Sequence, residues 1–175
     1  MRHLIQTLLL TLLLCTCGPA QKTTAPPPAL GTATNPITYE EFEEIAPLFQ
    51  QTNDTTYVIN FWATWCKPCR EEIKLLQQLA EKTEGQAIEV VLVSLDREET
   101  ALKRISGFLA ETGPDLNSIV LLDENDATWG KTIDRVWSGS LPTTIIYKDR
   151  LRYVYRRAFN TLADLERAVE PLIVL

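Results

Sequence analysis

Two cysteines, Cys66 and Cys69, with a Lys-Pro pair between them, form the pattern in this chain most able to do chemistry. A short apolar run precedes them and a helical periodicity follows, so we expect Cys66 at the first turn of a helix. There it faces unpaired backbone N–H groups and the positive end of the helix dipole, which both favour thiolate over thiol. The spacing therefore predicts an exposed attacking sulfur at Cys66 and a shielded resolving sulfur at Cys69.

Three other interpretations of the cysteine pair are weaker. A zinc site needs four N or S ligands, and the chain has no second CxxC pair and no His after His3. A structural disulfide across so short a separation closes only a tiny loop and stabilises little. A buried, inert pair is out of place beside a turn rich in tryptophan. We therefore prefer a redox-active Cys66–Cys69 disulfide that needs neither a metal nor a cofactor.

The composition limits what else the chain can do. Its 175 residues suit one domain with tails, and 45% hydrophobic residues are enough for a sizeable core. The 23 acidic and 17 basic residues give a net charge of −6, and no run of Lys or Arg marks a nucleic-acid surface. A single His removes Ser/His/Asp and Cys/His catalysis and His-based metal sites from consideration.

The first residues predict export. Their apolar run is too short to span a bilayer, so we expect a signal peptide over residues 1–16 rather than an uncleaved anchor. The segment that ends at Cys17 resembles a bacterial lipoprotein box and predicts lipidation of Cys17, although Thr16 stands where that box prefers Gly, Ala or Ser. Ordinary cleavage after Ala20 is the alternative.

A flexible tether is expected over residues 17–36, which are rich in Pro, Thr and Ala. The folded domain is expected over residues 37–175, where a capping box at residues 38–41 opens a helix that Pro47 interrupts. Apolar, β-branched runs then alternate with segments of helical periodicity, which predicts an α/β fold with a mixed sheet. The expected strands are 56–63, 88–95, 118–122, 143–148 and 151–157, and the expected helices are 66–82, 98–112, 126–133 and 161–170.

The segment FWATWCKPCREE, residues 61–72, resembles the active-site segment of the thioredoxin superfamily, in particular of extracytoplasmic thiol–disulfide proteins of the TlpA/ResA type. The likeness runs from about Thr38 to the C-terminus and includes the segments Ser94-Leu95-Asp96 and Leu141-Pro142-Thr143-Thr144. It implies a thioredoxin-like fold, with a central mixed β-sheet flanked by helices. It also implies an extra helix–strand insertion between Arg97 and Trp137.

The resemblance assigns roles to residues around the two cysteines. Pro142 matches a cis-proline that lies against the CxxC pair and offers backbone to an extended substrate peptide, and Thr143 follows it. Lys67 and Pro68 complete the motif between the cysteines, and Trp65 is expected to cover them.

Glu72 matches a carboxylate that ResA-like proteins keep near the dithiol, where it could relay protons to Cys69. A solvated acid on the helix face, beside Glu71, is an equally open interpretation. Asn60 stands where cytoplasmic thioredoxins carry a buried Asp, which favours the TlpA/ResA branch.

The resemblance implies a monomeric thiol–disulfide oxidoreductase that faces the periplasm and is anchored to the membrane by its lipid. Its Cys66 thiolate would attack disulfides of protein substrates, apocytochrome c among them, and Cys69 would release the reduced substrate. A membrane thiol reductase would restore the dithiol, because the periplasm is held oxidising. Two alternatives stay open. One is a peroxiredoxin-like peroxidase, although Thr64 is only two residues before Cys66, and the other is a tethered thioredoxin-fold binding module with an inert disulfide.

Overall fold

The computed structural model describes residues 25–98, 100–112 and 116–173. The expected signal peptide over residues 1–16, the lipidation of Cys17 and the alternative cleavage after Ala20 fall outside these residues and stay predictions. None of the helices in the described part is both long and apolar enough to cross a bilayer.

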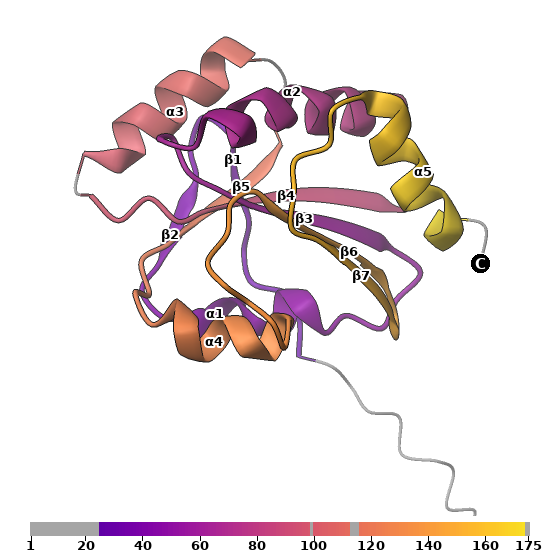
Figure 1. Cartoon of the computed structure of the whole chain (residues 1–175), viewed down its shortest axis with the longest axis horizontal. Helices are drawn as coiled ribbons and strands as arrows, with labels where there is room; N and C mark the ends of the chain where they lie inside the picture. Colours follow the sequence, from indigo (N-terminus) through magenta and orange to yellow (C-terminus); the bar gives the residue numbers. More distant parts are fainter. Residues whose placement is uncertain (1–24, 99, 113–115, 174–175) are drawn as a thin grey trace, which may run out of the picture.

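A seven-stranded mixed sheet forms the centre of the described domain (Figure 1). Its strands follow the order β1-β5-β4-β3-β6-β7, and β2 also pairs with β5. The pairs β3–β4, β4–β5 and β2–β5 are parallel, and the pairs β1–β5, β3–β6 and β6–β7 are antiparallel. The strands are β1 (Gly31–Thr32), β2 (Ile37–Tyr39), β3 (Thr56–Trp62), β4 (Ile88–Ser94), β5 (Asn117–Leu121), β6 (Thr143–Lys148) and β7 (Leu151–Tyr155).

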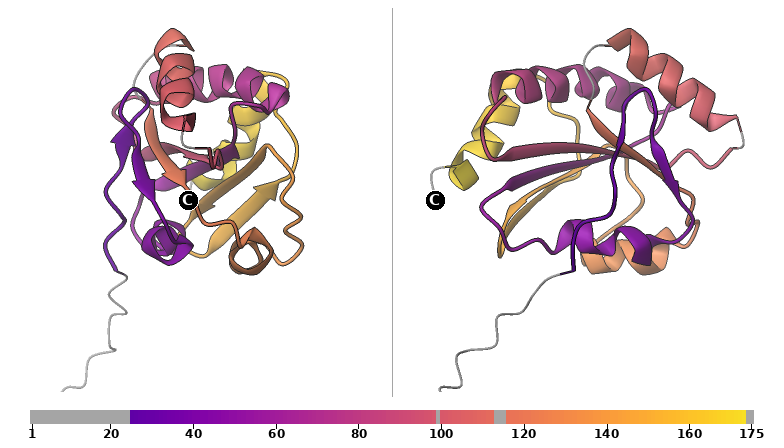
Figure 2. Two further views of the ribbon diagram at one scale, coloured as in Figure 1. Left: turned by 90° about the vertical axis from the view of Figure 1, so that its left-hand side faces the viewer. Right: turned by 180° about the vertical axis from the view of Figure 1, so that it is seen from behind.

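Helices cover both faces of this sheet (Figures 1 and 2). Helices α2 (Lys67–Lys82), α3 (Ala101–Thr112) and α5 (Leu162–Ile173) lie on one face. Helix α1 (Phe42–Ile45), the 3-10 turn η1 (Ala46–Phe49) and helix α4 (Asp126–Ile133) lie on the other. The predicted α/β, thioredoxin-like fold is therefore confirmed. Elements α3, β5 and α4 occupy the stretch in which the resemblance implies an insertion.

Strand β3 lies between two apolar cores, and every one of its residues is buried. Val58 and Trp62 belong to the core beneath α2 and α5, and Ile59 and Phe61 belong to the aromatic core beside α1 and α4. The side chains divide in this way because successive residues of a strand point to opposite faces. A strand buried on both sides explains the near-continuous apolar run that the sequence shows.

The first strand, β1, begins at Gly31, before residue 37. The predicted tether over residues 17–36 is therefore wrong in its last part. Gly31 and Thr32 pair with β5, and the chain returns at once into β2 through backbone hydrogen bonds between Thr32 and Asn35. A Cβ atom on Gly31 would lie 2.4 Å from the carbonyl oxygen of Asn35, so this return requires glycine. A two-residue strand leaves no periodicity in the sequence, which is why composition alone missed it.

The predicted capping box is also misplaced. Thr38 lies in β2, and the N-cap of α1 is Glu41, whose side chain and that of Glu44 cap each other's backbone N–H groups. Pro47 acts as expected, since α1 ends at Ile45 and the chain continues as the 3-10 turn η1. The other expected elements exist, and their ends differ from the expected ones by at most three residues.

Candidate active site

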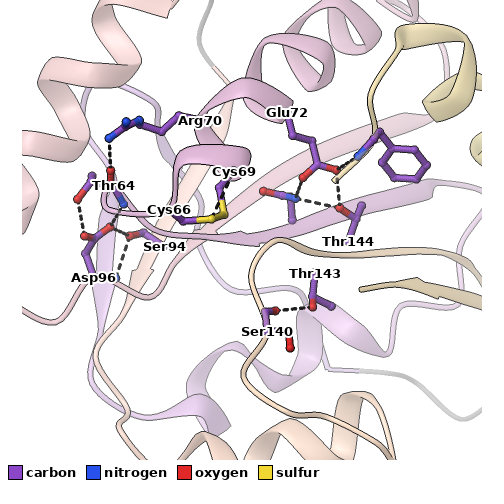
Figure 3. Close-up of a disulfide and its surroundings, with 12 residues drawn as sticks. Thr64, Cys66, Cys69, Arg70, Glu72, Ser94, Asp96, Ser140, Thr143 and Thr144 are labelled. Atoms are coloured by element: carbon purple, nitrogen blue, oxygen red, sulfur yellow. Dashed lines mark hydrogen bonds between the residues drawn. A yellow bond between two sulfur atoms is a disulfide. The ribbon is translucent and has the colours of Figure 1, made fainter. Parts of the chain in front are cut away.

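The dithiol turn, residues 63–66, connects the end of β3 to the start of α2 (Figure 3). Cys66 is the N-cap of α2, and its Sγ accepts a hydrogen bond from the backbone N–H of Cys69 at 3.3 Å. Pro68 occupies the first turn, where no N–H is needed. The two sulfurs form a disulfide, with the Cα atoms 5.3 Å apart. The predicted position of the cysteine pair at a helix N-terminus is confirmed.

The exposure of the two sulfurs differs from the prediction. Cys69 is fully buried, as expected, but Cys66 is only 5% exposed and is not an open sulfur in this disulfide form. Its Sγ is bonded to the sulfur of Cys69, which is fully buried. Trp65, by contrast, is 68% exposed on the surface beside Cys66, and its expected role as a cover for the dithiol stays a prediction.

A buried carboxylate, Asp96, holds the dithiol turn in place (Figure 3). Strands β3 and β4 are parallel and end together, with Trp62 opposite Ser94, so the segments that follow them meet. Asp96 is 1% exposed and accepts hydrogen bonds from the backbone N–H of Thr64 at 2.8 Å and from its hydroxyl at 2.6 Å. The Ser94 hydroxyl donates a third at 2.8 Å. Asp96 therefore fixes the residue two before Cys66.

Arg70, from the first turns of α2, holds the same turn from the other side. Its Nη1 donates to the carbonyl oxygen of Thr64 at 2.7 Å. Both polar groups of the Thr64 backbone are thus satisfied by side chains. Neither Arg70 nor Asp96 was identified as a site residue from the sequence. The available signal was a carboxylate directly after a buried strand that runs parallel to the strand of the cysteines.

Glu72 lies in α2, one turn after Cys69, and is completely buried. The interpretation of Glu72 as a solvated surface acid is therefore wrong, and its neighbour Glu71 takes that place, with its side chain 70% exposed. Oε1 of Glu72 accepts hydrogen bonds from the backbone N–H of Phe159 at 3.2 Å and the hydroxyl of Thr144 at 3.3 Å. Burial raises the pKa of Glu72 to about 7, and these hydrogen bonds offset only part of that effect.

Asn60 joins Glu72 to the sheet. It lies in β3 opposite Thr144 of β6, and its Nδ2 donates to Glu72 Oε2 at 3.1 Å and to the Thr144 hydroxyl at 2.9 Å. Its Oδ1 is buried and has no hydrogen-bond partner among the described residues. The hydrogen-bond partners of Glu72 in this cluster are neutral, and the attraction of the Arg157 guanidinium lowers its pKa by less than burial raises it, so a proton on its carboxyl group is well tolerated.

Three further residues that the sequence predicted for the site are Pro142, Thr143 and Lys67. The Leu141–Pro142 bond is cis, as the resemblance implies. Thr143 is buried and begins β6, and its hydroxyl donates to the carbonyl oxygen of Ser140 at 2.7 Å (Figure 3). Lys67 is exposed, 4.0 Å from Glu71. Their contribution to chemistry stays a prediction.

The described residues offer one group of carboxylates close enough to share a cation. Oxygens of Glu41, Glu43 and Asp123 lie within 4.8 Å of one another, and the two glutamates are exposed. Asp123 already accepts hydrogen bonds from the backbone N–H groups of Phe42 and Asn125. Neither cysteine belongs to this group, so it has no part in the dithiol site.

Comparison with known proteins agrees with this geometry. A model of the AhpC/TSA family matches residues 37–154. The thiol-disulfide oxidoreductase ResA of Oceanobacillus iheyensis is 32% identical over 109 residues, which cover 62% of this chain and 52% of that protein. The thioredoxin-like protein YneN of Bacillus subtilis is 32% identical over 101 residues, 58% of this chain and 55% of that protein. The chain thus spans about half the length of the curated relatives it matches.

Solved structures show the same fold. A DsbF homologue from Corynebacterium diphtheriae superposes with a TM-score of 0.55 at 28% identity, covering 68% of this chain and 73% of that chain. A thiol:disulfide interchange protein of the thioredoxin family from Chlorobium tepidum TLS has a TM-score of 0.61 at 20% identity, covering 85% of this chain and 97% of that chain. At that identity the second likeness concerns the fold alone.

Proposed function

This chain belongs to the AhpC/TSA family, and we propose that it is a thiol–disulfide oxidoreductase in which Cys66 and Cys69 cycle between dithiol and disulfide. The observation that carries the proposal is the Cys66–Cys69 disulfide at the N-terminus of α2, with the Cys66 Sγ accepting the backbone N–H of Cys69. In the reduced protein the same N–H and the helix dipole favour the Cys66 thiolate. The relative ResA of Oceanobacillus iheyensis carries the name of such a protein.

The reaction follows from the two positions. The Cys66 thiolate attacks one sulfur of a substrate disulfide, forms a mixed disulfide, and releases the other substrate sulfur as a thiolate that takes a proton from water. The Cys69 thiol then loses its proton and attacks the Cys66 Sγ, which releases the second substrate sulfur as a thiolate that also takes a proton from water. The substrate gains two electrons and two protons, and the protein is left as the disulfide.

Glu72 is the proposed acceptor for the proton of Cys69. Its pKa of about 7 makes it neutral or charged with nearly equal ease at neutral pH, as a group that exchanges protons requires. It lies one turn after Cys69 in α2, so along the helix it is nearer to the resolving cysteine than to the attacking one. A buried acid whose hydrogen-bond donors are all neutral groups suits proton exchange better than a purely structural role.

The direction and the setting are part of the proposal. We place the protein in the periplasm as a monomer, with a signal peptide over residues 1–16, a lipid on Cys17 and a tether up to the first strand. The apolar leader and the Pro-rich segment after it support this placement. There the protein reduces disulfides of protein substrates, apocytochrome c among them, and a membrane thiol reductase restores its dithiol.

The decisive experiment traps the intermediate. A Cys69→Ala variant cannot resolve the mixed disulfide, so substrate proteins should accumulate as adducts of Cys66 that are released by reductant. The matched control is the Cys66→Ala/Cys69→Ala double variant, which should capture nothing. A Cys66–Cys69 reduction potential below about −300 mV, together with an absence of adducts, would mark the disulfide as structural and overturn the proposal.

A peroxidase is the main competing activity, because a cysteine after a threonine at a helix start is the peroxiredoxin pattern. Here the Thr64 hydroxyl donates to Asp96 at 2.6 Å, and its spacing from Cys66 is short by one residue. We therefore expect wild-type protein to consume hydrogen peroxide no faster than a free dithiol, while it reduces insulin disulfides. Peroxide turnover faster than insulin reduction would replace the oxidoreductase proposal.

A further inference from the structure

A groove of about 460 Å³ opens beside the dithiol turn, on the side of α3. It begins one residue before Cys66 and is bounded by the dithiol turn, the start of α2, the segment after β4 and one side of α3. The residues that line this groove, called the α3 groove below, are Thr64, Trp65, Arg70, Glu98, Arg104 and Phe108.

The apolar part of the α3 groove consists of two rings. Trp65 is 68% exposed, the most exposed of the large apolar side chains among the described residues. Phe108 is half-buried, and its ring centroid lies 5.7 Å from that of Trp62, which is fully buried. Phe108 is thus supported from below, while Trp65 is free to pack against a ligand. Aromatic anchors of this kind carry much of the energy of protein–protein contacts.

The polar part of the α3 groove consists of two arginines. Arg70 is held in position by its bond to the Thr64 carbonyl oxygen. Arg104 lies 2.8 Å from Glu98, whose side chain is 70% exposed, and 4.0 Å from the buried Asp96. An exposed ion pair is worth little, so a carboxylate from a ligand can replace Glu98 on Arg104 at small cost. Guanidinium groups bind carboxylates through paired N–H donors.

A ligand for this groove must come from the substrate, because the proposed reaction ties the substrate to Cys66. In an extended chain each residue advances about 3.3 Å, so residues within three positions of the reacting substrate cysteine reach the groove from the mixed disulfide. We propose that the α3 groove is a specificity subsite for polypeptide substrates. It receives an aromatic side chain between Trp65 and Phe108 and an acidic side chain on Arg104 and Arg70. This inference rests on the proposed oxidoreductase function.

The test compares three disulfides as substrates of the reduced wild-type protein. The first is a peptide disulfide with Trp and Asp within three residues of Cys, and the second has Ser and Asn at those positions. The third is 2-hydroxyethyl disulfide, which is too small to fill the groove. We expect the Trp/Asp peptide to react about tenfold faster, in kcat/KM, than the Ser/Asn peptide, as one charge-assisted contact and one aromatic contact allow.

Variants in α3 then test whether the preference for the Trp/Asp peptide arises in the α3 groove. Arg104→Met and Phe108→Ala should each lower the ratio of the two peptide rates to about threefold or less. This ratio is insensitive to damage at the dithiol, because both peptides react there. Lys103→Met, at an exposed neighbouring position outside the groove lining, is the matched control and should keep the wild-type ratio.

The outcomes separate the two claims. Reduction of all three disulfides by the wild-type protein with a peptide ratio near one would overturn the subsite and leave the oxidoreductase standing. An equal loss of the ratio in Lys103→Met and Arg104→Met would also overturn the subsite. Failure to reduce any of the three disulfides would overturn the oxidoreductase function, and the subsite with it.

Discussion

Two buried carboxylates lie on opposite sides of the disulfide in the view of Figure 3, and the protein treats them differently. Asp96, after β4, accepts hydrogen bonds from one backbone N–H and two hydroxyls, and Arg104 lies 4.0 Å away. Glu72, inside α2, accepts from one backbone N–H, one amide and one hydroxyl, and its pKa rises to about 7. Both are at most 1% exposed.

The two carboxylates differ in the segments of the chain that supply their hydrogen-bond donors. Two of the three donors to Asp96 belong to Thr64 in the dithiol turn and the third is Ser94 at the end of β4, so Asp96 fixes the backbone that leads to Cys66. The donors to Glu72 belong to β3, β6 and the segment before α5, and the dithiol turn does not depend on them. Two carboxylates of equal burial thus differ in their surroundings: Asp96 holds the geometry of the turn, and Glu72 has the raised pKa on which its proposed role in proton exchange rests.

The largest expected effect is on stability, from Asp96→Ala. This change leaves the Thr64 N–H and the Ser94 hydroxyl without their buried acceptor, at a cost of roughly 3–5 kcal/mol in the free energy of unfolding. Urea unfolding of the oxidised protein measures it. Asp96→Asn keeps one acceptor oxygen and should lose less than half as much. If Asp96→Ala lowered the free energy of unfolding by less than about 1 kcal/mol, the dithiol turn would not depend on Asp96 for its conformation.

The next effect concerns pH. The folded pKa of Glu72, about 7, lies above the ordinary 4.5, so the folded protein keeps this proton while the unfolded chain loses it. Its contribution to stability is full below pH 4.5 and is lost as pH rises to about 7, by roughly 3 kcal/mol in total. Glu72→Gln should remove that part of the pH dependence. Parallel unfolding curves of wild type and Glu72→Gln across this range would contradict the assignment.

Glu72→Gln should also slow the release of substrate from the mixed disulfide. Loss of a proton acceptor for Cys69 is expected to cost about a hundredfold in that step, and to remove an inflection near pH 7 from its rate. Stopped-flow mixing of the reduced protein with a chromogenic disulfide separates the attack of Cys66 from the release by Cys69. If attack is slowed as much as release, Glu72 acts on the site as a whole.

The smallest effect is expected at the adjacent acid. Glu71→Gln removes an exposed carboxylate whose cation, Lys67, lies 4.0 Å away, and should change stability by less than about 0.5 kcal/mol. Rates and their pH dependence should match wild type. Because Glu71 and Glu72 are neighbours in one helix, this variant shows whether burial, and not helix position, sets the behaviour of Glu72.

Much of this could be predicted from the sequence, because the signals were local. The β3 run, the helix pattern after Cys66 and the hairpin of β6 and β7 are all readable from periodicity. The cis bond before Pro142 came from the resemblance. The burial of Glu72 could not be predicted, since its helix face is decided by β3 and β6, which are distant in the sequence. The contact of Asp96 with Thr64 depends on two parallel strands ending at the same level, which is a property of the sheet.

The segment that forms β1, turns, and continues into β2 has a consequence for solubility. Strand β5 would otherwise present a row of open N–H and C=O groups, and such an edge recruits strands from other molecules. Strands β1 and β2 occupy that row, with β1 antiparallel and β2 parallel to it. A chain shortened to begin at residue 37 would lose β1 and uncover part of this edge, so it should self-associate more than the longer chain.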